Sequence, residues 1–195
     1  MQIACGDKHD KNALDSANQS TSHLESKGSS MQPITNATST PDAIFEIGYA
    51  YASKNDKKAL EIANSLINTK GDNKDRLVSQ GYYLKGIYYM NTDQPESALK
   101  EFDSSIIASY TFVDAYIEKA ILLFDKKQYV ASLKTLSRAA EIDRYQADIY
   151  FWTAKNHQQL GHVEDAIYFY EQTTELAPDY QEAKQEIIKL KSIKK

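Results

Sequence analysis

The feature that most constrains this chain is a period of 34 residues that runs through most of its length. Positions of matched size and polarity recur in register, which indicates one supersecondary unit used several times. A single unit of this kind cannot bury its own apolar face, so neighbouring units must stack to make a core. An earlier segment follows the same pattern, with extra turn-forming residues at 68–73. The matched sets are Tyr82, Tyr116 and Tyr150; Gly86, Ala120 and Ala154; Ala98, Ser132 and Ala166; Leu99, Leu133 and Ile167; and Phe102, Leu136 and Tyr170.

The repeated region is predicted to be helical. Apolar residues recur with helical spacing, and no stretch alternates with the period of a strand. Thr40-Pro41-Asp42 marks the first helix, with a capping hydroxyl, a proline at the first position and an acid near the positive helix end. The expected helices are about 42–53, 56–69, 75–91, 95–108, 113–125, 129–142, 147–160 and 163–176, followed by a last helix at about 180–192.

The last helix has the pattern of a terminal cap. Tyr180, Ala183, Ile187 and Leu190 fall on one side, and the other side is polar. We therefore expect one face to dock on the preceding unit and the other to meet water.

The last complete unit resembles the tetratricopeptide repeat, and the likeness extends over about residues 42–178. It implies an all-α fold, an α-solenoid of about four helical hairpins plus the C-terminal capping helix. The implied domain is 41–195, with units at about 42–74, 79–112, 113–146 and 147–178. Lys85, Lys119 and Thr153 depart from the leucine that the family prefers. The positions that carry the resemblance are Tyr150, Ala154, Gly161, Ala166, Tyr170 and Pro178.

Residues 1–40 contain no Phe, Tyr or Trp and are rich in Ser, Thr, Asn and Gln, so we expect a disordered tail. Around Cys5, the segment Ile3-Ala4-Cys5-Gly6 resembles the cleavage end of a bacterial lipoprotein signal, which implies lipidation of Cys5. Gln2 departs from that motif, and no hydrophobic signal core precedes it. We expect a protein anchored in the bacterial cell envelope and facing the periplasm. The alternative is a cytoplasmic protein with a single free thiol.

No catalytic signature emerges, and we expect a protein that is not an enzyme and needs no cofactor. The net charge is −4 and no basic block is present, which argues against nucleic-acid binding. His9 and His23 lie in the tail, and His157 and His162 are five positions apart, a spacing that places residues of one helix on different faces. No pair has the spacing of metal ligands, so no metal site is expected.

In the tetratricopeptide family the first helix of each hairpin faces a concave groove. The Lys, Asn and Arg clamp with which some members grip chaperone tails is missing here, and the corresponding positions are apolar with an acidic rim. The strongest candidates are Tyr49, Ile87 and Ile121, because family members usually have polar residues at this position of the repeat. The repeat positions of Phe45 and of Met90 often contribute in part to packing between helices. The expected partner-binding residues are Phe45, Tyr49, Tyr83, Ile87, Met90, Ile117, Ile121, Phe124, Phe151, Asp114 and Asp148.

These residues predict a scaffold that holds another protein or peptide bearing apolar and basic side chains. The occupant could equally be a second copy of this chain or its own tail. Two other functions stay open: a cytosolic co-chaperone-like adaptor, and an accessory domain that binds a lipid or small molecule.

Overall fold

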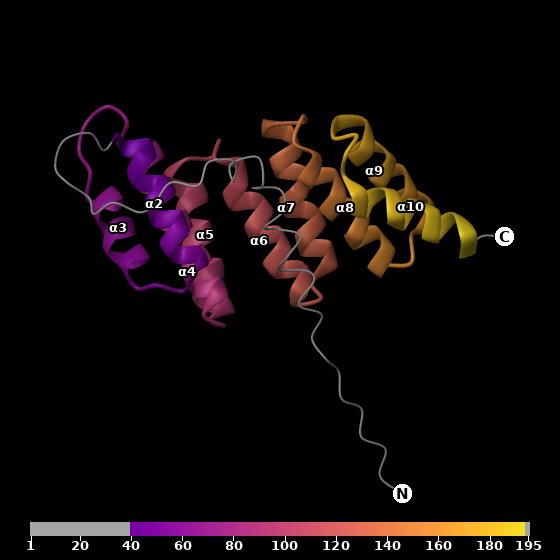
Figure 1. The fold of residues 1–195 in the computed structure, drawn as a ribbon, viewed down its shortest axis with the longest axis horizontal. Coiled ribbons are helices and arrows are strands. Elements are labelled where there is room, and N and C mark those ends of the chain that lie inside the picture. The colour runs from indigo at the N-terminus through magenta and orange to yellow at the C-terminus, as the bar shows by residue number, and fades with distance from the viewer. Residues whose placement is uncertain (1–39, 194–195) are drawn as a thin grey trace, which may run out of the picture. The chain divides into compact units, whose positions relative to one another are not determined.

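The computed structural model describes residues 40–193, and every regular element within that range is an α-helix (Figure 1). The helices form four consecutive antiparallel hairpins and one final helix. Their ends agree with the sequence-based prediction to within two residues, and the all-α prediction is confirmed. The helices are α2 (Pro41–Ser53), α3 (Lys58–Ile67), α4 (Lys74–Asn91), α5 (Pro95–Ala108), α6 (Val113–Asp125), α7 (Tyr129–Ile142), α8 (Ala147–Gln159), α9 (Val163–Leu176) and α10 (Gln181–Ile193).

Local sequence signals set where the helices begin and turn. Thr40 caps α2, since its Oγ1 accepts a hydrogen bond from the Ala43 backbone N–H at 3.3 Å. Each hairpin turn places one residue in the left-handed region, and the next N–H then donates to the carbonyl five positions earlier, as from Gln128 to Leu123 at 2.9 Å. The left-handed residues are Asn55, Asp93 and Lys127, each at φ 58°, and Gly161 at φ 77°.

Small residues let the two helices of a hairpin approach closely. A Cβ atom added to Gly86 would lie 2.4 Å from a ring carbon of Phe102, so only glycine fits opposite this large ring. In the next hairpin the same positions hold Ala120 and Leu136, both buried. The pairing of a small with a bulky residue, which the 34-residue period predicted, therefore recurs at the centre of these two hairpins.

Two tyrosines of the repeated set Tyr82, Tyr116 and Tyr150 link their hairpins to the loop before them. The Tyr116 hydroxyl donates to the Tyr110 carbonyl at 3.1 Å, and the Tyr150 hydroxyl donates to the Arg144 carbonyl at 2.9 Å. Both bonds span six residues, so equivalent residues satisfy equivalent backbone groups.

Helix α10 closes the array as a cap. Ala183 and Leu190 are buried against α8 and α9, and Tyr180 and Ile187 pack at the edge of the same core. The predicted docking face is therefore confirmed.

Among residues 40–193, no helix is both long and apolar enough to span a bilayer. The predicted disordered tail and the predicted lipidation at Cys5 lie outside the described residues.

Candidate functional site

The first helix of each hairpin carries the side chains predicted to bind a partner. We call the surface that α2, α4, α6 and α8 form on this side the first-helix face. It is built around Phe45 and Tyr49 of α2, Asp114 and Glu118 of α6, and Asp148 of α8.

The prediction that this face has an exposed apolar floor is wrong for most of the apolar residues named. Neighbouring hairpins cover them: the Tyr83 ring meets the Phe112 ring at 5.2 Å, and Tyr180 stacks on Phe151 at 4.7 Å between ring centroids. They belong to the core that stacking makes, which is the structural need that the sequence did not reveal. Each of these residues is at most 7% exposed: Tyr83, Ile87, Ile117, Ile121 and Phe151.

The other predicted residues remain reachable in part. Phe45, Tyr49, Met90 and Phe124 are half-buried at the edges of the core clusters. Tyr49 stacks on Tyr83 with 6.3 Å between ring centroids and 11° between ring planes. The solvent-facing apolar surface here is thus limited to the exposed parts of these four side chains.

Asp114 and Asp148 supply the acidic part of the face. Asp114 is exposed as a residue, and Asp148 is half-buried and accepts a hydrogen bond from the Tyr180 hydroxyl at 3.0 Å. Protein atoms packed around the Asp114 carboxyl displace water and raise its pKa; a hydrogen bond with Gln146 opposes this, and the charge of Asp148 adds to it.

Glu118 is the residue of this face that sequence reasoning missed. One turn along α6 from Asp114, it stands 34 residues from both Leu84 and Trp152, which are 0% and 2% exposed. A carboxylate therefore occupies a position that the neighbouring units fill with buried apolar side chains. That break in an apolar column was visible in the sequence, and it is the signal that could have identified Glu118.

The environment of Glu118 opposes its ionisation. Burial raises its pKa from 4.5 to about 8, the charges of Asp114 and Asp148 add to the shift, and the Tyr83 hydroxyl reduces it. Its Oε2 is buried and has no hydrogen-bond partner within residues 40–193. The Oε1 of Gln80, a residue that is 7% exposed, is in the same situation. Buried oxygens without donors are costly, so this part of the face is suited to a ligand that brings donors or positive charge.

The aromatic residues beside Glu118 share its electrostatic environment. Burial, followed by the charges of Glu118 and Asp114, raises the pKa of the Tyr83 hydroxyl well above its usual value. The same causes raise the pKa of Tyr49, against a hydrogen bond with Ser53. Both phenols therefore keep their protons at physiological pH and can act as donors.

The C-terminal end of the first-helix face is occupied by the cap. Lys155 of α8 pairs with Glu182 of α10 at 3.2 Å, and its ammonium lies 4.8 Å from the Trp152 ring centroid. Gln158 likewise donates to Glu186 of α10 at 2.8 Å. Because α10 uses these groups, the part of the face that α10 leaves uncovered lies on α2, α4, α6 and the start of α8.

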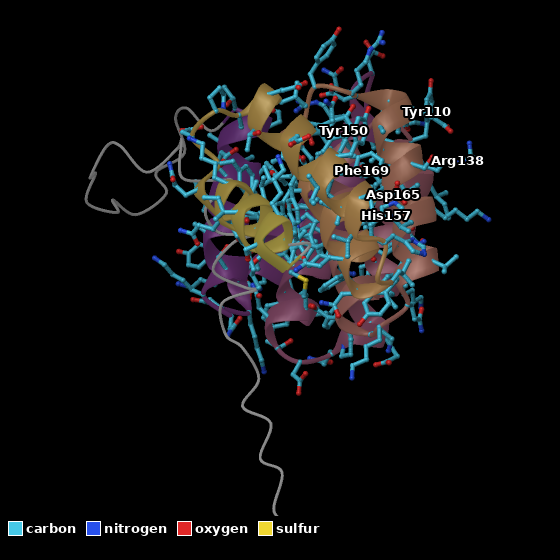
Figure 2. All side chains as sticks on the ribbon, turned by 90° about the vertical axis from the view of Figure 1, so that its right-hand side faces the viewer. Tyr110, Arg138, Tyr150, His157, Asp165 and Phe169 are labelled. Atoms are coloured by element: carbon cyan, nitrogen blue, oxygen red, sulfur yellow. The ribbon has the colours of Figure 1, made fainter. Side chains whose placement is uncertain are left out.

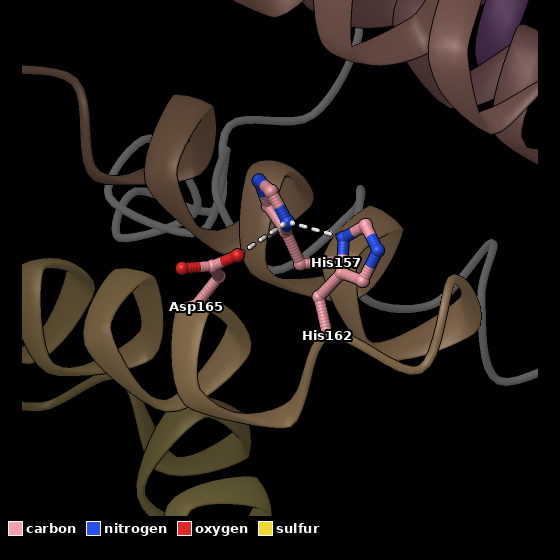
Figure 3. Close-up of side chains that lie close together, drawn as sticks. All are labelled: His157, His162 and Asp165. Carbon is pink, nitrogen blue, oxygen red and sulfur yellow. Dashed lines mark hydrogen bonds and ion pairs between the residues drawn. The ribbon is translucent and has the colours of Figure 1, made fainter.

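The histidine prediction needs a correction. His162 does not continue the helix of His157; it follows the α8–α9 turn, which brings the two Nδ1 atoms to 3.4 Å and His157 Nδ1 to 3.5 Å from Asp165 Oδ2 (Figure 3). Helical spacing does not apply across a turn, so the inference that the two rings lie apart is wrong. Burial lowers the pKa of His157, Asp165 opposes that effect and His162 adds to it.

No protein-family model matches the sequence, and no curated protein matches it. Solved structures do match. The first tetratricopeptide domain of Spaghetti (RPAP3), bound to the HSP90 peptide SRMEEVD, is 21% identical with a TM-score of 0.58, over 63% of this chain and 98% of that chain. YrrB, described as a tetratricopeptide protein with an unusual peptide-binding site, is 17% identical with a TM-score of 0.57, over 74% and 73% of the two chains.

The fold is a tetratricopeptide-like α-solenoid. MamA is also similar to this chain, with 22% identity and a TM-score of 0.62 over 76% of this chain and 84% of that chain. At these identities the similarity concerns the tetratricopeptide-like backbone, and it does not extend to the side chains of the first-helix face.

Proposed function

We propose that this protein is a non-catalytic scaffold that binds a partner polypeptide on the first-helix face, with a basic side chain of the partner placed at Glu118. The observation that carries the proposal is the buried Oε2 of Glu118, which has no hydrogen-bond partner within the described residues and lies in the field of two further carboxylates. A guanidinium or ammonium would supply the missing donors and the opposite charge together.

The aromatic residues define the rest of the ligand. Phe45 and Tyr49 are half-buried next to Tyr83, with the Phe45 and Tyr83 ring centroids 6.1 Å apart. Their exposed edges can pack against the aliphatic stem of a lysine or arginine, or against an apolar neighbour. The expected ligand is therefore an extended or helical segment with apolar residues beside at least one basic residue.

Charge separates this proposal from the co-chaperone-like alternative. The peptide bound by the Spaghetti domain, SRMEEVD, ends in acidic residues. The carboxylates of Asp114 and Asp148 would repel such a tail, and the Glu118 carboxyl could not supply positive charge, so we expect selectivity of the opposite sign.

The experiment compares two labelled peptides by fluorescence anisotropy with the full chain: SRMEEVD and a version in which lysine replaces each acidic residue. The basic peptide should bind, and the double variant Asp114→Asn with Glu118→Gln should weaken it by about 30-fold or more, as expected for loss of a desolvated charge pair. Glu175→Gln, an exposed acid in α9, is the matched control and should leave binding unchanged. Equal binding of both peptides, binding of neither, or an unaffected double variant would contradict the proposal.

A pH series adds an independent readout. A cation bound beside Glu118 favours its ionised form, so binding should release a proton at pH values below about 8; the affinity should rise with pH up to about 8 and level off above it. Glu118→Gln cannot release that proton, and its affinity should change less over the same range. If the affinities of the wild type and of Glu118→Gln changed similarly with pH, Glu118 would not contact the bound cation, even if the peptide bound.

The partner can be captured with a photoreactive amino acid at Glu46. Glu46 is exposed on α2, and its charge acts on Tyr49 of the first-helix face. Val130 of α7 is 73% exposed and serves as the control position. A partner that crosslinks at Glu46 but not at Val130, and whose capture is lost with Asp114→Asn and Glu118→Gln, would support binding on this face. Equal crosslinking at both positions would contradict it.

We also propose that the scaffold is tethered to a bacterial membrane and faces the periplasm, as the sequence around Cys5 indicates. Metabolic labelling with a fatty acid should mark the protein, and Cys5→Ala should lose both the label and membrane partitioning. Absence of label together with unchanged partitioning of Cys5→Ala would leave the cytoplasmic alternative.

A further inference from the structure

Three side chains with metal-binding chemistry meet at the α8–α9 turn. His157 lies in the last turn of α8, His162 directly precedes α9, and Asp165 lies in its first turn. One ligand atom from each lies within 4.8 Å of the other two, and His157 Nδ1 faces both of its neighbours (Figure 3). None of the three is among the residues around which the first-helix face is built.

The separations fit a common ion better than a hydrogen-bond network. A neutral imidazole has at most one N–H at Nδ1, so His157 cannot satisfy both His162 Nδ1 at 3.4 Å and Asp165 Oδ2 at 3.5 Å by donating one proton. Ligands of a tetrahedral zinc ion, with bonds of about 2.0–2.1 Å, stand about 3.3–3.4 Å apart. Both measured separations are close to that value, and the third pair, His162 and Asp165, lies within 4.8 Å, so binding would need that pair to close up further.

Aromatic stacking already holds the His157 ring in place. The His157 ring stacks on Phe169 with 5.3 Å between centroids and 17° between planes, and Phe169 stacks in turn on Tyr150 at 6.5 Å. In Figure 2, which views the array from its C-terminal end, Tyr150, Phe169 and His157 are labelled one below another. The His162 N–H donates to the His157 carbonyl at 2.9 Å, so the backbone that joins the two histidines is also fixed. Little ordering is then needed for an ion to bind.

Ligand type and exposure narrow the choice of ion. Two imidazoles with one carboxylate suit late first-row divalent ions, whereas Mg²⁺ and Ca²⁺ prefer oxygen ligands. His162 and Asp165 are exposed, so water can reach the remaining coordination positions. We propose that His157 Nδ1, His162 Nδ1 and an Asp165 carboxylate oxygen bind a Zn²⁺ ion that crosslinks α8 to α9.

Calorimetric titration of Zn²⁺ into the full chain, prepared without a polyhistidine tag, tests the site. We expect one ion per chain and a thermal midpoint that rises with Zn²⁺ concentration. His162→Ala and Asp165→Asn should each weaken binding by about tenfold or more, since even loss of a group that only supports a metal ligand costs that much. Both residues are exposed, and circular dichroism will show that the variants stay folded.

The matched control replaces the two tail histidines, His9→Ala with His23→Ala, and should retain binding. The ring nitrogen signals of His157 and His162 should shift on addition of Zn²⁺ in the wild type. Absence of binding, undiminished binding by His162→Ala, or loss of binding in the tail variant would overturn the proposal.

Discussion

Replacing Glu118 with Gln should stabilise the protein, and the gain should grow with pH. Gln has the shape of the protonated acid and cannot ionise, so the variant keeps the packing and removes the cost of burying a charge. The unfolded chain ionises this carboxyl near pH 4.5, whereas the folded protein holds its proton up to about pH 8. Folding therefore takes up a proton between these two values, and the stability of the wild type falls as the pH rises through that window.

The magnitude follows from the size of the pKa shift. At 1.36 kcal/mol for each pH unit, the shift corresponds to about 3 kcal/mol at pH 7 and roughly 5 kcal/mol once the carboxyl is ionised in both states. Glu118 is only half-buried, and solvent screening reduces the effect. We expect Glu118→Gln to gain about 2 kcal/mol at pH 7 and almost nothing at pH 4.5, where neither state carries the charge.

Urea unfolding followed by circular dichroism, at several pH values from 4.5 to 8.5, measures this difference. Glu96→Gln is the control, because Glu96 is exposed and its hydrogen bond with Lys126 lowers its pKa. Its contribution has the opposite sign: it is present above the unfolded pKa and lost as the pH falls. Parallel pH profiles for the wild type and Glu118→Gln, or a loss of stability in the variant at pH 8, would refute the reasoning.

Two further predictions concern packing. Gly86→Ala should lower the free energy of unfolding in urea by about 1–2 kcal/mol, because overpacking against Phe102 outweighs the better helix propensity of alanine. Adding Phe102→Leu reproduces the Ala120 and Leu136 pair of the next hairpin and should recover most of this loss. Absence of recovery would contradict the steric explanation. Ala183→Asp, at a fully buried position of α10, should cost about 3 kcal/mol or more. Hydrogen exchange should then rise in α10 and α9 more than in α2, and a uniform rise would contradict a local capping role.

Helix boundaries and hairpin pairing were predictable from the sequence because neighbours along the chain determine them. The Thr40 cap, the left-handed turn residues and the 34-residue match of small with bulky positions all act within one or two hairpins. The docking face of α10 was predictable for the same reason, since its apolar residues recur with the helical period.

Exposure and the candidate site were decided by contacts between hairpins. Ile87 and Ile121 were expected on the exposed face from their position in the repeat, yet they are 3% and 5% exposed because adjacent hairpins close over them. His157 and His162 are five positions apart in sequence, but a turn reversal brings their rings together.

Glu118 shows the division most clearly. The sequence by itself places a carboxylate in a column that is otherwise apolar, at Leu84 and Trp152. Helical spacing also places it one turn from Asp114, but only the tertiary structure brings Asp148 near it and removes water from it, which moves its pKa to about 8. Residue spacing determines which side chains share a helix face, whereas burial and charge coupling depend on atoms that the folded chain brings together from distant positions.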